Sequence, residues 1–385
     1  MRFLPLVLKN LLRKKTRSGL TVGSILLPFF VICLLGTFVA MLDADPSQGR
    51  GMYRLAVRHK VSIANVLPAS HLEKIRQLQG VKAVTPFNWF GGRYVDFSSF
   101  NFFQRFAVDP EVFFDVFDSS GVVDGSIEAW KSDRSGLMVG QLLMKKYGWR
   151  LGQQITLTGD IWPGTYTFTI RAVYRGNSEA SVFFDQKVID EALPARAGRY
   201  TMIWVKAVDA AATRDLIPRI NALFENSASP ARAETEKEFQ NNYIALLGNV
   251  KLFFRSLTAV IAAVVLLIAA NTMAMAARER VKELAVFRAI GFPKGTIFGL
   301  LLGESALLAI FGATAGLALY LLVFPRLRTV VLYSPLAGIA SALRIYPGVL
   351  AEAFAATIFV GILAGLLPAI RSIQRPIADG LRLIA

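Results

Sequence analysis

The sequence is poor in cysteine, histidine and charge. Its single cysteine, Cys33, lies inside an apolar run, which excludes a disulfide framework. The two histidines, His59 and His71, lie apart in the sequence, and without a cysteine nearby they do not predict a zinc site. Charged residues make up 18% of the 385 residues and hydrophobic residues 54%, with a mean hydropathy of +0.46. These values are typical of an integral membrane protein.

Four apolar runs are long enough to span a bilayer. A spanning helix needs ~20 mostly apolar residues, because every backbone polar group must be hydrogen-bonded within the segment. The runs cover residues 18–42, 251–277, 295–324 and 347–370. The roughly two hundred residues between the first two runs are mixed in composition and could form a core of their own. The sequence therefore predicts a membrane bundle of four transmembrane helices with a domain inserted between helices 1 and 2.

The distribution of basic residues predicts the orientation in the membrane. The formal net charge is +16, and many cations fall in residues 1–17, 278–294 and 371–385. By the positive-inside rule these segments are cytoplasmic. Three arginines in residues 325–346 depart from the rule. We expect both termini in the cytoplasm and the large domain in the periplasm, so the positive charge does not indicate a nucleic-acid partner.

The inserted region, residues 43–250, alternates between strand and helix patterns. Residues 53–63 place apolar side chains at period two, as in a half-buried strand, and residues 69–80 place them at helical spacing. Such a mixture predicts an α+β domain. From Glu234 onward no strong helix breaker occurs, so we expect a helix to continue from the domain into the second transmembrane segment.

An aromatic segment, residues 87–106, stands out within this domain. Its sequence, FNWFGGRYVDFSSFNFFQRF, contains more aromatic residues than core packing needs. Two interpretations fit: a surface that meets a hydrophobic substrate or lipid, or strands whose aromatic side chains form the core.

Polar and small residues inside the third and fourth apolar runs allow two interpretations each. Glu304 is a costly residue in a membrane, and it either makes a polar contact between the inner helices or points toward the cytoplasmic headgroups. The pairs Gly312 and Gly316, and Gly361 and Gly365, form small-xxx-small patterns that let helices approach closely. These contacts can lie within one subunit or between subunits.

Longer stretches carry a resemblance to a known family. Residues 271–319, NTMAMAARERVKELAVFRAIGFPKGTIFGLLLGESALLAIFGATAGLAL, resemble the signature region of FtsX-like or MacB-type ABC transporter permeases. The stretch AGLLPAIRSIQRPIADGLR is similar to the family's terminal pattern, with DGLR replacing the usual Ala before Leu. In the domain, HLEKIRQLQGVKAVTP and VGQLLMKKYGWRLGQQITL are similar to helix-strand elements of the periplasmic core. The resemblance covers nearly the whole chain.

This resemblance assigns an expected role to each segment. In chain order we expect a cytoplasmic basic segment, transmembrane helix 1, a MacB-like periplasmic core domain, transmembrane helix 2, a cytoplasmic coupling element, transmembrane helix 3, a short periplasmic loop, transmembrane helix 4 and a cytoplasmic tail. Their expected bounds are residues 1–17, 18–42, 43–250, 251–277, 278–294, 295–324, 325–346, 347–370 and 371–385.

The coupling element is implied to dock on a separate ATPase subunit. The residues implied in coupling are Arg278, Glu279, Arg280, Glu283, Leu284, Arg288, Ala289 and Gly291. The local sequence agrees, because it is rich in helix formers and places opposite charges three residues apart. From the residues alone, a solvated juxtamembrane helix that only sets topology or contacts anionic lipid fits as well.

The resemblance implies a permease with no catalytic residue, cofactor or metal site of its own. No GxxxxGK[ST] loop occurs in the sequence, so ATP and Mg²⁺ are expected on the partner ATPase. The chain starts with a short basic segment rather than an ATPase domain, which resembles the split-gene members LolC, LolE and FtsX. A second permease copy, identical or similar, membrane lipid and a periplasmic adaptor or hydrolase are the other expected partners.

The expected function follows from the same resemblance. In a bacterial inner membrane, ATP-driven mechanotransmission would move the periplasmic domain and so export or extract an envelope or periplasmic substrate. Candidate substrates are a lipoprotein, another hydrophobic molecule, a drug or a peptide. The alternative is a non-transporting ABC-type regulator that activates a periplasmic cell-wall hydrolase.

Overall fold

The chain divides into two compact units. The computed structural model describes residues 15–43, 53–98, 101–176, 179–245, 249–279, 287–332 and 343–374. The first unit, here called the helical unit, comprises Met1–Met41, Asn249–Arg326 and Arg344–Ala385. The second, here called the domain, comprises Leu42–Gly248 together with Leu327–Leu343.

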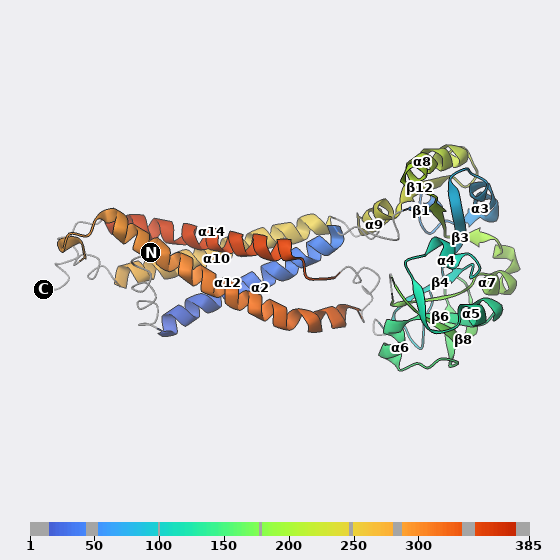
Figure 1. Cartoon of the computed structure of the whole chain (residues 1–385), viewed down its shortest axis with the longest axis horizontal. Helices are drawn as coiled ribbons and strands as arrows, with labels where there is room; N and C mark the ends of the chain where they lie inside the picture. Colours follow the sequence, from blue (N-terminus) through green and yellow to red (C-terminus); the bar gives the residue numbers. More distant parts are fainter. Residues whose placement is uncertain are drawn as a thin grey trace. The chain divides into compact units, whose positions relative to one another are not determined.

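Among the described residues, four long helices form most of the helical unit (Figure 1). They are α2 (Lys15–Asp43), α10 (Val250–Glu279), α12 (Lys294–Leu332) and α14 (Pro347–Gln374). Each contains a stretch long and apolar enough to cross a membrane. α12 is longer than predicted, because it continues through Pro325 to Leu332. A proline removes one backbone hydrogen bond of a helix, and here that loss does not end it.

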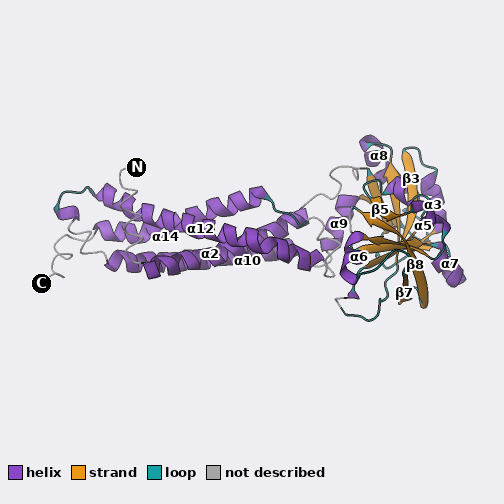
Figure 2. Ribbon diagram, turned by 60° about the horizontal axis from the view of Figure 1, so that its bottom comes forward, coloured by secondary structure: helices purple, strands orange, loops and turns teal. Residues whose placement is uncertain are grey.

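The domain is built from short strands and helices (Figure 2). Its strands are β1 (Arg54–His59), β2 (Leu67–Pro68), β3 (Val81–Trp89), β4 (Gln104–Val108), β5 (Gly121–Gly125), β6 (Gly136–Gly140), β7 (Gln154–Gly159), β8 (Gly164–Arg175), β9 (Ser181–Asp185), β10 (Arg199–Tyr200), β11 (Met202–Ala207) and β12 (Ala231–Thr235). Its helices are α3 (Ala69–Arg76), α4 (Phe113–Val116), α5 (Ile127–Ser132), α6 (Gln141–Tyr147), α7 (Lys187–Ala192), the short 3₁₀ helix Pro194–Arg196, α8 (Ala210–Phe224) and α9 (Glu236–Ala245). The predicted fold class, four membrane helices with an inserted α+β domain, is confirmed.

One sheet runs through the whole domain in the order β12-β1-β11-β3-β4-β9-β6-β8-β5, with β7 paired to β8. Most neighbours are antiparallel, but β4 pairs parallel with β9 and β6 pairs parallel with β8. The sheet has two halves. We call β12, β1, β11 and β3 with α3 and α8 the first half, and β4 to β9 with α4 to α7 the second half.

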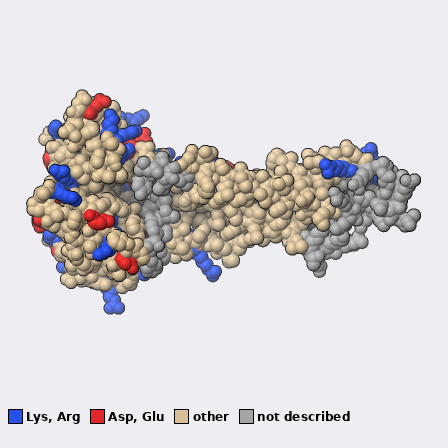
Figure 3. Space-filling view, turned by 180° about the vertical axis from the view of Figure 1, so that it is seen from behind, with Lys and Arg blue, Asp and Glu red and all other residues tan. Residues whose placement is uncertain are grey.

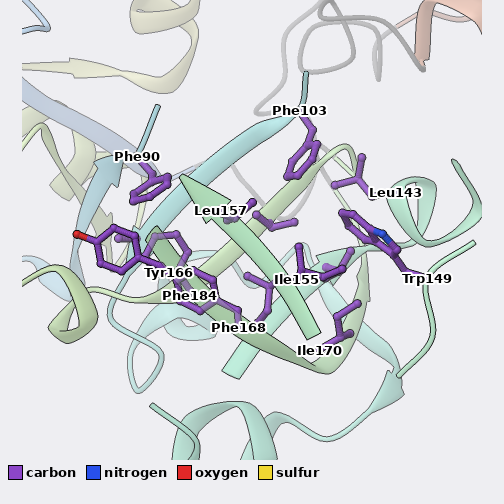
Figure 4. Packing of buried hydrophobic residues seen from close by; sticks show 14 of the residues in the cluster. Phe90, Phe103, Leu143, Trp149, Ile155, Leu157, Tyr166, Phe168, Ile170 and Phe184 are labelled. Atoms are coloured by element: carbon purple, nitrogen blue, oxygen red, sulfur yellow. The ribbon is translucent and has the colours of Figure 1, made fainter. Parts of the chain in front are cut away.

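Apolar side chains cover both faces of this sheet. In β1, Leu55 and Val57 pack on one face against α3 and α8, whereas Ala56 between them faces the other side. The same alternation in the second half produces the cluster drawn in Figure 4, in which Phe168 and Phe184 lie side by side, their ring centroids 4.4 Å apart. A third cluster, which includes Trp130, spans both halves on the opposite face. The strand that looked half-buried in the sequence, β1, is therefore buried on both sides.

The aromatic segment belongs mainly to this core. Phe90 and Phe103 are fully buried, and Phe87 is nearly so. Phe97, in contrast, is 71% exposed. Of the two interpretations, the structure supports core packing for most of the segment, because β3 and β4 place these rings between the sheet and its covering helices.

The prediction of one continuous helix from Glu234 into the second transmembrane segment is wrong at two described positions. Glu234 belongs to β12, and α9 begins only after a capping box in which Thr235 and Glu238 bond to each other's backbone N–H at 3.1 and 2.9 Å. α9 ends at Ala245, and α10 starts after Asn249, whose Oδ1 accepts the backbone N–H of Leu252 at 3.1 Å. Each helix therefore has its own start signal.

Candidate coupling site and helix contacts

A tight turn at residues 287–292 forms the described part of the coupling element, just before α12. The backbone N–H of Phe292 donates to the carbonyl of Phe287 at 3.0 Å, and that of Gly291 donates to Arg288 at 3.1 Å. Gly291 has φ +99°, a conformation that side chains disfavour. These bonds form a Schellman motif, completed by contact between the rings of Phe287 and Phe292, whose centroids lie 5.5 Å apart.

One face of this turn is anchored in the helical unit. Phe287 packs against a buried cluster formed by Ile297 and Leu301 of α12 and Ala369 of α14. Ile290 is 71% exposed, and Phe292, whose ring contacts Phe287, is 38% exposed. The turn therefore offers an apolar tip to its surroundings while its base is held by two long helices.

The predicted coupling residues fall partly within the described chain. Arg280, Glu283 and Leu284 lie outside the described residues, and Arg278 and Glu279 end α10 with side chains that are not described. Arg288, Ala289 and Gly291 lie in the turn, and Arg288 is half-buried. Sequence reasoning missed the apolar residues Phe287, Ile290 and Phe292. Two aromatic residues flanking an Ile-Gly pair were the available signal, because a Schellman motif often brings its flanking apolar residues into contact.

Glu304 is buried inside the helical unit. Only 6% of it is exposed, and its neighbour Ser305 is 2% exposed, with Oγ donating to the carbonyl of Leu301 at 3.0 Å. Glu352, at the start of α14, is exposed. Of the two interpretations of Glu304, its burial supports an inner contact rather than a side chain directed at the headgroups.

The predicted small residues lie at contacts between helices of this chain. A carbon added to Gly312 would lie 2.6 Å from Ile25 of α2, and one added to Gly316 would lie 2.8 Å from the carbonyl oxygen of Leu26. A carbon added to Gly361 would collide with Ala309, and one added to Gly365 with Ser305. The first pair therefore lets α2 approach α12, and the second pair lets α14 approach α12.

A buried hydrogen bond crosses between α2 and α12. The hydroxyls of Thr37 and Tyr320 lie 2.8 Å apart, and both residues are almost fully buried. Cys33, one turn before Thr37, is also completely buried. Little in the sequence predicts this pair, because single Thr and Tyr residues are common in apolar runs.

The histidines of the domain make structural contacts with backbone groups. The Nε2 of His71 lies 2.8 Å from the carbonyl oxygen of Ser229, and Nδ1 of His59 accepts the backbone N–H of Val61 at 3.2 Å. Within the part of the chain that the structure describes, no group of three His, Cys, Asp or Glu side chains could hold a metal ion.

Comparison with known proteins gives two family matches that together cover most of the chain. The family described as a MacB-like periplasmic core domain matches residues 18–223. The family described as FtsX-like permease C-terminal matches residues 255–377. No curated protein matches the sequence.

Solved structures similar to this chain align with about half of it. The periplasmic region of MacB from Actinobacillus actinomycetemcomitans is 13% identical, has a TM-score of 0.38, and covers 53% of this chain and 96% of its own. The extracellular domain of the noncanonic ABC-type transporter YknZ from Gram-positive bacteria is 12% identical, with a TM-score of 0.36, over 47% of this chain and 99% of its own. A permease-protein domain from Porphyromonas gingivalis is 15% identical, with a TM-score of 0.32, over 47% and 88%.

Proposed function

The chain belongs to the FtsX-like, MacB-type family of ABC transporter permeases, and we propose that it transmits the movement of a separate ATPase to its periplasmic domain. That movement exports or extracts an envelope or periplasmic substrate, such as a lipoprotein, another hydrophobic molecule, a drug or a peptide. ATP and Mg²⁺ bind to the ATPase subunit, and a second permease copy completes the complex. Both termini and the coupling element lie on the cytoplasmic side, where the ATPase binds.

The observation that carries this proposal is the anchored turn at residues 287–292. Its exposed tip, Ile290 and Phe292, suits a hydrophobic pocket on a partner, since fully desolvated apolar anchors dominate many interfaces. Its base, Phe287, contacts α12 and α14. A displacement of the tip is therefore transmitted to α12 and α14 through direct packing contacts.

The helix contacts extend this path. Gly312 and Gly316 hold α12 against α2, and Gly361 and Gly365 hold α14 against α12. Close-packed helices move as a block more readily than they deform, because packed interiors resist compression. We infer that α2, α12 and α14 move together when the ATPase changes shape.

The test is to purify the tagged protein in mild detergent with its native partners and to assay ATP hydrolysis in the eluate. We expect a soluble ATPase to co-purify with the parent protein. Phe292→Glu places a charge on the tip and should remove most of the associated ATPase, because an unpaired charge in an apolar interface is costly.

The matched control is Phe97→Glu, the same change at an exposed phenylalanine of the domain. This variant should keep the associated ATPase. If Phe292→Glu retains as much ATPase as Phe97→Glu, the coupling assignment is wrong. The other proteins in the eluate decide between functions: an adaptor or channel supports export, whereas a cell-wall hydrolase supports the regulator.

A further inference from the structure

The side chain of Arg54 lies where three segments of the domain meet. Arg54 is the first residue of β1, the first strand after α2 in the chain, and only 2% of it is exposed. Its Nε and Nη2 donate to the two carboxylate oxygens of Glu236 at 2.8 and 3.2 Å. Glu236 is the first residue of α9, the last element before α10. The bond therefore joins the strand that follows one membrane helix to the helix that precedes the next.

The same guanidinium also reaches the second half of the domain. Its Nη1 donates to Oγ of Ser119 at 3.2 Å, and it lies over the ring of Phe117, 5.3 Å from the centroid. Residues 117–119 connect α4 to β5, both of which belong to the second half. We call Arg54, Glu236, Ser119 and Phe117 the Arg54 junction.

Neighbouring contacts hold each side of the junction in place. Asn242 of α9 donates to Glu234 of β12, which also pairs with Arg58 of β1 at 2.7 Å. On the other side, the buried Lys206 of β11 pairs with Asp118 at 3.1 Å. Both α9 and the 117–119 segment are thus fixed to the first half. Arg54 hydrogen-bonds to both, and the ring of Trp204 contacts Phe239 of α9 and Phe117.

We propose that Arg54 is a positioning residue that makes α9 move as one body with the domain, whose two halves already share a sheet and a core cluster. The inference rests on the proposed function, in which movement reaches the domain from the membrane helices. A bidentate ion pair restrains both distance and orientation, and the flat guanidinium can stack on a ring at the same time. A displacement of α9 is then passed to the second half without loss at the boundary between the halves.

Arginine at this position is not interchangeable with lysine. A lysine ammonium keeps the positive charge and can reach one carboxylate oxygen, but it lacks the planar fork that holds two oxygens, a hydroxyl and a ring together. Arg54→Lys therefore keeps the positive charge of the residue but removes its simultaneous contacts with Glu236, Ser119 and Phe117. Arg219→Lys is the matched control, because Arg219 forms an exposed pair with Asp215 at 3.0 Å on α8.

The experiment measures the distance between α9 and the second half in the full chain. Asn241→Cys and Val123→Cys place spin labels on an exposed position of α9 and on β5, whose Val123 is 47% exposed. The single native cysteine, Cys33, is completely buried. Distances are recorded by pulsed electron spin resonance in nanodiscs that contain the chain and its co-purified ATPase, without nucleotide and with ATP plus vanadate.

We expect one narrow distance in the labelled parent and in Arg219→Lys, with no change on adding ATP and vanadate. In Arg54→Lys the distribution should broaden without nucleotide, and its centre should shift with nucleotide. Identical distributions in Arg54→Lys and the parent, in both states, would overturn the proposal. If Arg54→Lys does not give a folded domain, Glu236→Gln releases only the α9 side and should broaden the same distance; an unchanged distance in it overturns the proposal.

Failure of the proposed function gives a different result. In that case no ATPase co-purifies and nucleotide changes no distance in any variant. The nucleotide-free comparison of parent and Arg54→Lys still reports whether the junction holds α9 to the second half.

Discussion

The two units of this chain bury their residues in different ways. In the domain, large aromatic side chains such as Trp130 and Phe184 are fully buried. In the helical unit fewer large side chains are fully buried, among them Phe29 and Tyr320, and small residues such as Ala309, Ala313 and Ala369 are fully buried beside them. Water forces the domain to close its own apolar core, whereas lipid does not penalise exposed apolar side chains, so close approach of backbones matters more there.

The surfaces show the same contrast. Figure 3 shows charges of both signs spread over the domain and few along the length of the helical unit. Leu322 and Phe359 of the helical unit are 70% and 63% exposed. Among the four helices, α10 is packed least: 6% of its most apolar stretch is buried, against 33–39% for the others. One chain therefore completes the domain but leaves much of α10 to be covered by lipid or protein.

Each unit also carries its own probe, which makes the comparison testable. The five tryptophans of the sequence, at positions 89, 130, 149, 162 and 204, all lie in the domain. The single cysteine, Cys33, is buried in α2. Tryptophan fluorescence thus reports unfolding of the domain, and reaction of Cys33 with a thiol dye reports opening of the helical unit.

The largest effect is expected in the domain core. Phe184→Ala removes a fully buried ring that packs against Phe90 and Phe168, and such a change costs about 3–5 kcal/mol in the free energy of unfolding. The midpoint of the fluorescence transition of the full chain should fall steeply.

The control is Phe97→Ala, the same change at a ring that is 71% exposed. It should alter the free energy of unfolding by no more than about 0.5 kcal/mol. Similar losses in the two variants would mean that the burial contrast does not determine stability. A fall in the Cys33 transition equal to that in fluorescence would show that the two units unfold together.

A smaller effect is expected where α2 meets α12. Gly316→Ala places a carbon 2.7 Å from the ring of Phe29 and 2.8 Å from a backbone carbonyl, and such overpacking costs about 1–3 kcal/mol. The Cys33 transition should move to lower temperature, and the fluorescence transition should not. Gly299→Ala, on the same helix with no atom within 4 Å of the added carbon, is the control. Equal behaviour of both variants would argue against a contact role for Gly316.

The sequence predicted the architecture well, because its signals were local. Four apolar runs predicted four helices, and α3 fell within residues 69–80, with Gly80 at φ +96° just beyond it. The starts of α9 and α10 were also locally encoded, the first by the Thr235–Glu238 capping box and the second by Asn249. We predicted a continuous helix because these signals are single polar residues in a helix-favouring context, and we gave no weight to Gly248, which directly precedes Asn249 in the sequence.

Contacts between distant residues could not be predicted in the same way. Thr37 and Tyr320 are 283 residues apart, and Arg54 and Glu236 are 182 apart. Strand order depends on such pairings, and the parallel pairing of β4 with β9 leaves no local pattern. For the coupling site, the resemblance pointed to Gly291 among the coupling residues, but nothing predicted the exposure of Ile290, which depends on how Phe287 packs.

A third, smaller effect concerns polar contacts inside the helical unit. Tyr320→Phe removes the hydroxyl that lies 2.8 Å from Thr37 and should destabilise the unit by about 1 kcal/mol. The midpoint of the Cys33 transition should fall modestly, and the midpoint of the fluorescence transition should not change. The double variant Tyr320→Phe with Thr37→Val removes both polar groups and should recover part of the loss, because no hydroxyl is then left without its partner. A double variant no more stable than Tyr320→Phe would contradict this account.

The smallest effect near neutral pH should come from His71 in the domain. Burial lowers the pKa of His71 below its ordinary value of 6.5; its bond to Ser229 opposes this shift, whereas nearby Lys74 and His59 add to it. Its Nδ1 is buried without a hydrogen-bond partner, so a second proton has no acceptor. The folded state therefore favours neutral His71, and the domain should lose stability as pH falls through 6.5 toward the lower pKa of the folded state.

The test is His71→Gln, because glutamine does not titrate but can still donate to Ser229. The parent should be more stable than His71→Gln by the fluorescence transition, and this difference should shrink between pH 7.5 and about pH 5.5. An advantage that is equal at both pH values would show that His71 does not titrate over this range, and the burial of its ring would then carry no pH dependence.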